Sequence, residues 1–209
     1  MSAVTSPTTR RQLSRERTRF EILDAAWALC RSGGLASLNL RDLAAAVGMQ
    51  APSLYTHFGS KMEIYDAMFA QGYGAALDAM PVVRATRSRA EAERQFRDGI
   101  HAFIDFCLAD SARYQLLFQR TIPGFVPSEA SMDLANASLA RAREGLAALG
   151  LTAPEALDLL TSVITGLVDQ QISNDPGGRR WVRLTDDMLD MYLAFAIRRW
   201  RQTNRRTTP

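Results

Sequence analysis

The sequence has few of the residues on which metal binding and redox chemistry depend. Its 209 residues include only two cysteines and two histidines, and none of these four lies at metal-ligand spacing from another. Cys30 and Cys107 each lie among apolar neighbours in a helical pattern, which predicts buried, reduced thiols. A redox-sensing pair is the alternative. We therefore expect no metal and no cofactor.

Motifs that bind nucleotides or activate nucleophiles are also missing. The chain has no G-x-G-x-x-G after a strand, no G-K-[ST] phosphate loop and no G-x-S-x-G. No apolar run reaches the ~18 residues of a transmembrane helix. No apolar stretch of about 7–15 residues follows Arg10 and Arg11, so no secretory signal is predicted. We expect a cytoplasmic protein that is not an enzyme and has no membrane partner.

The small positive net charge of +3 gathers at the N-terminal end. Residues 1–61 carry eight basic and four acidic side chains, whereas the other 148 residues carry 17 arginines and 18 acids. Lys61 is the only lysine. Because phosphates attract basic side chains, this distribution favours a nucleic-acid partner for the N-terminal part, although solvated helix faces alone could explain it.

The segment Leu40–Lys61 has the pattern of two short helices joined by a tight turn. Gly48 can adopt the positive φ on which the first helix ends, and Pro52 suits the first turn of the second. Leu54 and Phe58, four residues apart, are expected to face the core. The apolar face of the first helix is predicted to consist of Leu40, Leu43, Ala44 and Val47.

This segment resembles the DNA-binding domain of the TetR family of bacterial transcriptional regulators. The family pattern T-x-R-D-I-A-x-x-x-G-V-S-x-x-x-L-Y-x-H-F-x-S-K corresponds to N-L-R-D-L-A-A-A-V-G-M-Q-A-P-S-L-Y-T-H-F-G-S-K over Asn39–Lys61. The resemblance begins near Thr18. Asn39 stands where the family usually has Thr, and Gln50 stands where Ser usually caps the second helix, which predicts a weaker cap there.

The resemblance implies an all-α protein with an N-terminal three-helix helix-turn-helix DNA-binding domain and a C-terminal α-helical ligand-binding and dimerisation domain. We expect these domains at 14–61 and 62–203, between a flexible basic arm at 1–13 and a tail at 204–209. Some of the implied DNA-proximal residues suit base edges and others suit phosphates. They are Arg41, Gln50, Ala51, Pro52, Ser53, Tyr55, Thr56, His57 and Lys61. Helix packing is the alternative role for His57.

Outside the motif the chain has the pattern of successive helices. Ser60, Ser88 and Thr152 each begin a capping box with a glutamate three residues later. The first helix is predicted to bury Phe20, Leu23, Trp27 and Cys30. The predicted helices run over about Arg15–Ser32, Ser60–Ala79, Ser88–Leu108, Asp110–Phe118, Ser128–Leu149, Thr152–Ser173 and Thr185–Gln202.

The last two predicted helices are apolar over more than one face, so each needs two packing partners. We expect one partner to be the core of the same chain and the other to be the same helix pair of a second copy. This makes a homodimer with a four-helix interface, as the resemblance also implies. The predicted dimer contacts are Leu160, Ile164, Leu167, Met188, Met191, Tyr192 and Phe195.

The C-terminal part also places a few polar side chains on otherwise apolar helix faces. This combination favours a cavity for an unidentified small-molecule effector that is neutral or weakly polar, with simple core packing as the alternative for each aromatic residue. The candidate cavity residues are Phe96, His101, Phe103, Tyr114, Phe118, Met132, Asn136, Thr161, Thr165, Val168 and Asp169.

These features together predict a sequence-specific transcriptional regulator. One recognition helix of about eight residues reads too few base pairs to identify a genomic site. We therefore expect a homodimer on a palindromic operator in double-stranded DNA, acting as a repressor that a small apolar ligand releases. A ligand-independent DNA-binding protein of the same fold is one alternative. A helical carrier of hydrophobic ligands or a small helical enzyme is the other.

Overall fold

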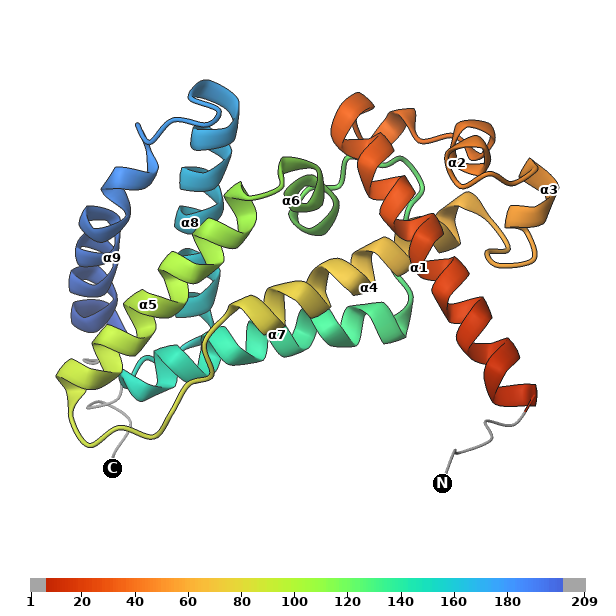
Figure 1. The fold of residues 1–209 in the computed structure, drawn as a ribbon. Helices are drawn as coiled ribbons and strands as arrows, with labels where there is room; N and C mark the ends of the chain where they lie inside the picture. Colours follow the sequence, from red (N-terminus) through yellow and green to blue (C-terminus); the bar gives the residue numbers. More distant parts are fainter. Residues whose placement is uncertain (1–6, 201–209) are drawn as a thin grey trace. The chain divides into compact units, whose positions relative to one another are not determined.

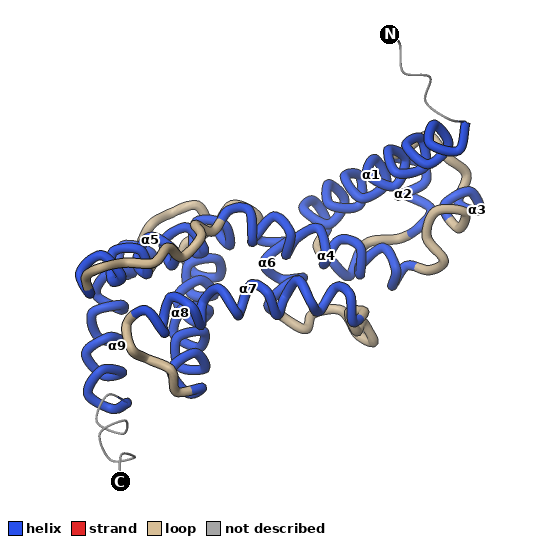
Figure 2. Tube along the Cα trace, turned by 90° about the horizontal axis from the view of Figure 1, so that it is seen from below, coloured by secondary structure: helices blue, strands red, loops and turns tan. Residues whose placement is uncertain are grey.

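The computed structural model describes residues 7–200, and all regular structure in this range is helical (Figures 1 and 2). The all-α prediction is therefore confirmed. No helix in this range is both long enough and apolar enough to cross a membrane. The α-helices are α1 (Pro7–Gly33), α2 (Leu40–Ala46), α3 (Ala51–Leu54), α4 (Lys61–Ala79), α5 (Arg89–Leu108), α6 (Ser111–Phe118), α7 (Glu129–Ala148), α8 (Pro154–Asn174) and α9 (Thr185–Trp200).

The chain divides into two compact units. Unit 1 comprises Met1–Gly72 and Ala112–Met132, and unit 2 comprises Tyr73–Ser111 and Asp133–Pro209. Helices α4 and α7 each begin in unit 1 and end in unit 2. The boundary between the units therefore falls within these two helices and not in a linker. The domain boundary expected between residues 61 and 62 stays a prediction.

Helix α1 begins at Pro7 rather than at Arg15, so residues 7–13, predicted to belong to a flexible arm, form its first turns. Proline suits this position because first-turn amides have no helical partner. Residues 1–6 lie outside the described range. Phe20, predicted to be buried, is 61% exposed. The buried face of α1 is centred near Ala26 and Cys30, which leaves Phe20 at its edge.

The N-terminal half of α4 is central to unit 1. The Tyr65 and Phe69 rings lie 5.9 and 6.1 Å, centroid to centroid, from the ring of Phe125 in the loop after α6. The Asp66 carboxylate accepts hydrogen bonds from the Ser128 amide at 2.7 Å and its hydroxyl at 2.8 Å. The α6–α7 segment of unit 1 is therefore held to the same helix that follows the helix-turn-helix.

Unit 2 is built on α5, α8 and α9. Side chains from all three helices are buried in it, among them Ile100, Leu160 and Leu189. The Tyr192 hydroxyl on α9 donates to the Ala156 carbonyl on α8 at 2.7 Å. Arg141 on α7 donates to the carbonyls of Leu77 and Met80 at the C-terminal end of α4. These hydrogen bonds satisfy carbonyls that have no partner within the helix.

Predicted capping residues start three of these helices, α2, α4 and α5. The Asn39, Ser60 and Ser88 side chains accept from backbone amides three residues later, at 2.9, 3.1 and 3.2 Å. The capping box predicted at Thr152 is wrong. Ala153 is the N-cap of α8, and its methyl side chain cannot accept a hydrogen bond. Pro154 in the first turn has no amide N–H, so one donor fewer needs a partner there.

Candidate nucleic-acid interface

Helices α2 and α3 form the helix-turn-helix that the sequence predicts. α2 ends at Ala46 with Val47 as its C-cap, and Gly48 follows with φ 67°, the left-handed conformation that glycine adopts without steric cost. The Met49 amide then donates to the Ala44 carbonyl at 2.8 Å, which closes the turn. Gln50 is the N-cap of α3 and makes no side-chain hydrogen bond to the helix, in agreement with the weak cap expected there.

The second helix is shorter than the eight residues expected, since α3 covers only Ala51–Leu54. The chain continues to Phe58 through i→i−3 hydrogen bonds, such as Thr56 to Ser53 at 3.2 Å and His57 to Leu54 at 2.9 Å. We call Ala51–Phe58 the recognition segment. One helical turn is too short to be stable alone, so its conformation depends on what it packs against.

Two side chains fix which face of the recognition segment points outward. Leu54 and Phe58 are 1% and 2% exposed, which confirms that they face the core. Tyr55 is 54% exposed, and the neighbouring positions 52, 53 and 56 are exposed as well. The predicted DNA-proximal residues thus lie around α2, the recognition segment and the start of α4. Of these, Arg41, Gln50, Pro52, Ser53, Tyr55 and Thr56 are exposed, and Ala51, His57 and Lys61 are half-buried.

Two arginines of α1 hold the end of the recognition segment, and sequence reasoning missed them. Arg15 donates to the Thr56 carbonyl at 3.1 Å. Arg19 donates to the His57 carbonyl, pairs with the Glu63 carboxylate at 3.5 Å, and places its guanidinium 4.0 Å from the centroid of the Phe58 ring. Their i, i+4 spacing was the only sequence signal, and it does not identify acceptors about 40 residues away in the chain.

The electrostatic surroundings of His57 favour its neutral form. Burial lowers the pKa of His57, and the positive charges of Arg15 and Arg19 lower it further. The Nδ1 atom of His57 is buried and has no hydrogen-bond partner among the described residues.

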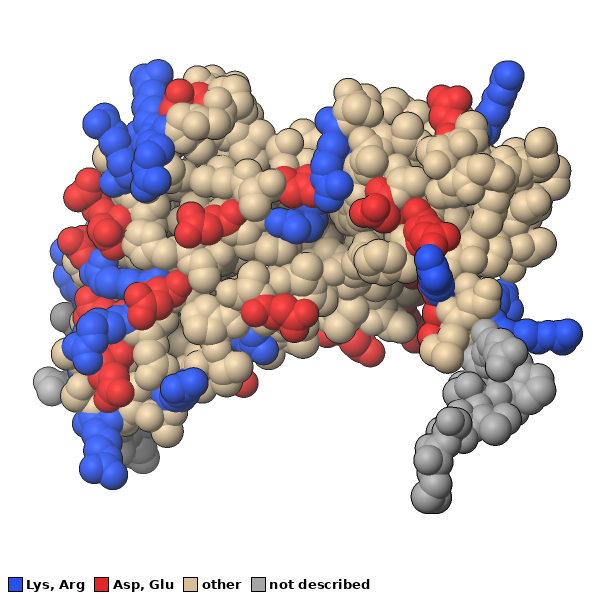
Figure 3. All heavy atoms as spheres, in the orientation of Figure 1, with Lys and Arg blue, Asp and Glu red and all other residues tan. Residues whose placement is uncertain are grey.

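The Lys61 ammonium lies 5.5 Å from the centroid of the Tyr65 ring, at the first turn of α4. In Figure 3 the α2–α3 end of unit 1 shows mainly uncharged side chains, with a basic one extending from it.

The predicted cavity residues are not all interior. Met132 and Asn136 are exposed, and Asn136 is therefore not the interior polar group that the sequence predicts. The Thr161 and Thr165 hydroxyls donate to the carbonyls of Asp158 and Thr161 on their own helix, at 3.0 and 2.8 Å. Each hydroxyl therefore uses its proton in a hydrogen bond to a backbone carbonyl of its own helix.

The remaining members of this set differ in burial. Tyr114 and Phe118 lie in unit 1 with ring centroids 5.4 Å apart. The others lie in unit 2, where Phe96 and Val168 are buried, and His101, Phe103 and Asp169 are half-buried. The existence of a ligand cavity stays a prediction.

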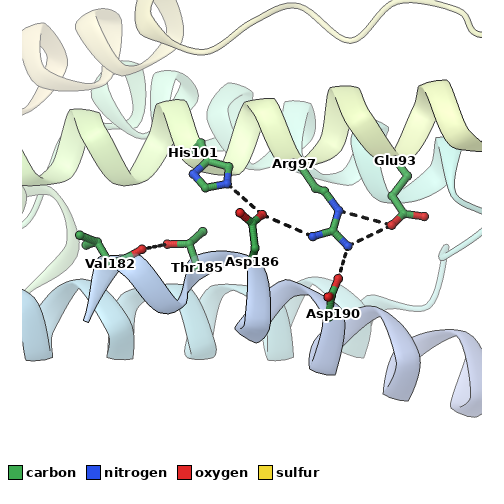
Figure 4. A network of polar contacts seen from close by, with 7 residues as sticks. All are labelled: Glu93, Arg97, His101, Val182, Thr185, Asp186 and Asp190. Carbon is green, nitrogen blue, oxygen red and sulfur yellow. Dashed lines mark hydrogen bonds and ion pairs between the residues drawn. The ribbon is translucent and has the colours of Figure 1, made fainter. Parts of the chain in front are cut away.

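A polar cluster joins α5 to α9 in unit 2, and His101 belongs to it (Figure 4). Arg97 pairs with Glu93 at 3.0 Å, with Asp186 at 3.5 Å and with Asp190. The His101 Nε2 atom lies 3.1 Å from the Asp186 carboxylate, and this hydrogen bond lowers the pKa of Asp186. Figure 3 shows acidic and basic side chains interleaved over this part of unit 2. His101 thus ties two helices together.

The predicted dimer residues fall into two groups. Leu160, Ile164, Met188 and Tyr192 are each at most 9% exposed within the single chain, so they serve the core of unit 2. Met191 and Phe195 on α9 are 64% and 41% exposed, and Leu167 is half-buried. The second group therefore has apolar surface left for contact with another copy, and the dimer contacts themselves stay a prediction.

Comparison with known proteins identifies the helix-turn-helix region. The model of the family described as bacterial regulatory proteins, tetR family, matches residues 22–68. One curated relative, the HTH-type transcriptional activator FasR of Mycolicibacterium smegmatis, is 30% identical over 108 residues. That match covers 52% of this chain and 48% of FasR, so the chain spans about half the length of this relative.

Solved structures extend the likeness to most of the fold. The TetR family transcriptional regulator PfmR from Thermus thermophilus superposes with a TM-score of 0.60 at 19% identity, covering 83% of this chain and 97% of PfmR. The TetR family protein ActR of Streptomyces coelicolor, solved in complex with actinorhodin, has a TM-score of 0.55 at 19% identity and covers 85% and 97%. At these identities the structures show the fold alone. Residues 22–68 therefore match the TetR family of bacterial transcriptional regulators, and most of the chain has the same fold as solved proteins of that family.

Proposed function

We propose that the protein binds a palindromic operator in double-stranded DNA as a homodimer, and that a small, mainly apolar ligand releases it. The recognition segment is the observation that carries this proposal. Its Leu54 and Phe58 are anchored in the core of unit 1, while Ser53, Tyr55 and Thr56 are exposed. A short helical segment anchored on one face and polar on the other suits the DNA major groove.

The exposed residues suit different parts of the duplex. Arg41, exposed on α2, can reach either guanine O6 and N7 or a phosphate. Ser53 can accept or donate to a base edge, and Ala51 and Pro52 offer apolar contact to thymine methyl groups. Hydroxyl and ammonium groups such as those of Tyr55, Thr56 and Lys61 suit phosphate oxygens, which fix register without reading sequence.

A second copy supplies the reach that one recognition segment lacks. Two copies related by a twofold axis read two half-sites about 34–36 Å apart or somewhat farther, which multiplies the discrimination. The exposed Met191 and Phe195 on α9 support an interface between copies, because solvent-facing Met and Phe side chains gain from burial against a second apolar face.

Helix α4 is the element through which a ligand would act. It starts directly after the recognition segment in unit 1 and continues into unit 2, where Arg141 holds its C-terminal carbonyls. A ligand releases DNA only if it binds the free form more tightly than the DNA-bound form. ActR, a relative in fold, is solved with the small molecule actinorhodin, which supports a ligand role for the helical part of this chain.

Selection from random duplexes tests the DNA part of this proposal. We expect the enriched sequences to contain an inverted repeat, because a twofold dimer reads each half-site in the same way. Enrichment of a single unrepeated half-site would contradict the dimeric mode. Binding of every duplex with equal affinity at moderate salt would contradict sequence-specific regulation altogether.

The direction of regulation needs its own experiment. We propose repression, whereas the relative FasR is described as an activator. Transcription in vitro from a promoter that carries the selected operator decides between them. We expect less transcript as protein is added, and more transcript would assign activation instead.

Ligand-independent DNA binding is the second candidate, and the structure favours it in one respect. Thr161 and Thr165 donate hydrogen bonds to carbonyls of their own helix and Asn136 is exposed, so the interior offers a ligand fewer free donors than the sequence predicts. A thermal-shift screen of apolar compounds separates the two, because a ligand that binds only the folded state raises the unfolding temperature.

A further inference from the structure

Residues of other helices hold the C-terminal end of the recognition segment and Gly59, which follows it. On the carbonyl edge, Arg15 and Arg19 of α1 donate to Thr56 and His57. On the amide edge, the Glu63 carboxylate of α4 accepts from the Gly59 amide at 2.6 Å. Arg19 and Glu63 also pair with each other at 3.5 Å, so the turn at the end of the segment is enclosed by one ion pair.

Arg19 is placed to hold protein rather than DNA. Its guanidinium lies 4.0 Å from the centroid of the Phe58 ring, and Phe58 is 2% exposed. The Arg19 side chain is 33% exposed, whereas that of Arg17 is 82% exposed and pairs with Glu21 of its own helix at 3.0 Å. A planar guanidinium can stack on a ring and bond at its edge at the same time, which an ammonium cannot do.

We propose that Arg19, assisted by Arg15 and Glu63, is the positioning residue that orients the recognition segment for base reading. This inference rests on the proposed DNA-binding function. A four-residue helix has little stability of its own, so the direction of Ser53 and Tyr55 follows from the buried Leu54 and Phe58 and from the contacts that fix the C-terminal end. Arg19 acts on sequence discrimination through the protein backbone, without touching a base or a phosphate.

Three variants test this role. Arg19→Lys keeps the positive charge but loses the planar guanidinium group. Arg19→Gln loses both the charge and the guanidinium group. Arg17→Gln is the control, because it removes one positive charge from the same helix. Dissociation constants are measured over a salt series, for the selected operator and for an unrelated duplex. We expect both Arg19 variants to lose about tenfold in operator affinity. On the unrelated duplex, Arg19→Gln should bind with the same affinity as the Arg17→Gln control. Arg19→Lys should bind that duplex with the same affinity as the unsubstituted protein.

The salt dependence separates positioning from phosphate contact. A residue that neutralises one phosphate changes the slope of log affinity against log salt by about 0.9. We expect Arg19→Gln to have the same slope as Arg17→Gln. A slope lower by about 0.9 than that of the control, or full recovery of operator affinity in Arg19→Lys, would overturn the proposal.

Hydrogen exchange without DNA gives a second readout. We expect amides 56–59 to exchange about tenfold faster in Arg19→Lys than in Arg17→Gln, while amides of α5 and α9 are unchanged. If Arg19 variants unfold globally, Glu63→Gln replaces them, because it weakens the same enclosure from α4. Unchanged exchange at residues 56–59 in Glu63→Gln as well would overturn the proposal.

The outcomes also distinguish this inference from the function on which it rests. If the unsubstituted protein selects no DNA sequence, the proposed function fails, and with it the role of Arg19 in base reading. If it selects an operator and the Arg19 variants bind that operator as Arg17→Gln does, only the positioning role fails.

Discussion

At the scale of single residues, polar groups in unit 1 are satisfied by partners far away in the chain. The Trp27 indole donates to the Gln71 side chain at 2.7 Å, and the buried Tyr65 hydroxyl donates to the Leu35 carbonyl at 2.5 Å. Burial raises the pKa of Tyr65 to about 12, so its hydroxyl remains a donor across the physiological range. Such bonds make the orientation of the aromatic core specific as well as stable.

The Tyr65 hydrogen bond leads to a stability prediction. Tyr65→Phe keeps the ring and removes the donor, so we expect a loss of about 1 kcal/mol, or about 2–4 °C in Tm. Tyr55→Phe is the matched control, because the Tyr55 side chain is 54% exposed. Thermal unfolding followed by circular dichroism measures both. Equal Tm values for the two variants would mean that the buried bond contributes nothing.

His57 leads to a pH prediction. Its pKa in the folded protein is lowered, so the unfolded chain binds a proton first as the pH falls. The folded state therefore loses stability as the pH falls below about 6.5, the ordinary value for the unfolded chain. We expect Tm to fall less between pH 7 and pH 5 in His57→Gln than in the unsubstituted protein. Parallel curves of Tm against pH would contradict this assignment.

At the scale of helices, local sequence was sufficient at several ends that a cap or a glycine decides, although the capping box predicted at Thr152 was wrong. Asn39, Ser60, Ser88 and Gly48 all act as their patterns predict. Local sequence was insufficient where a distant partner decides. The shortness of α3 follows from its i→i−3 hydrogen bonds and its enclosure by α1 and α4, and neither leaves a local pattern in residues 51–58.

The uncapped start of α3 leads to a prediction at this scale. Gln50→Ser offers a short hydroxyl acceptor to the free first-turn amides, so we expect a gain of about 0.5–1 kcal/mol in stability. Gln50→Ala is the control, since alanine cannot cap. Denaturant unfolding at equilibrium compares the two. A serine variant no more stable than the alanine variant would show that the segment is already fully fixed by its neighbours.

At the scale of the whole molecule, the sequence predicted two partners for α8 and α9, and the structure supplies one of them. Leu160, Ile164, Met188 and Tyr192 are buried within the chain, and Met191 and Phe195 remain exposed. A broad apolar helix looks the same in sequence whether it is buried by its own chain or by another copy. Assigning each side chain to one of these surfaces required the packing of α5, α8 and α9.

The exposed pair on α9 predicts the oligomeric state. We expect Met191→Glu with Phe195→Glu to weaken self-association by roughly 30-fold per residue, because each places a charge in an apolar interface. Val126→Glu, at a loop position 81% exposed, is the control. Sedimentation equilibrium measures the dissociation constant. If the double variant dimerises as tightly as the control, the interface lies elsewhere.

The scarcity of lysine gives the molecule a useful chemical property. Lys61 carries the only side-chain amine in the sequence, and it lies half-buried at the first turn of α4, next to the recognition segment. With the α-amino group blocked beforehand, an amine-selective fluorophore therefore labels one defined internal position in each copy. Its emission would report occupancy of the neighbouring surface in real time, without any engineered cysteine.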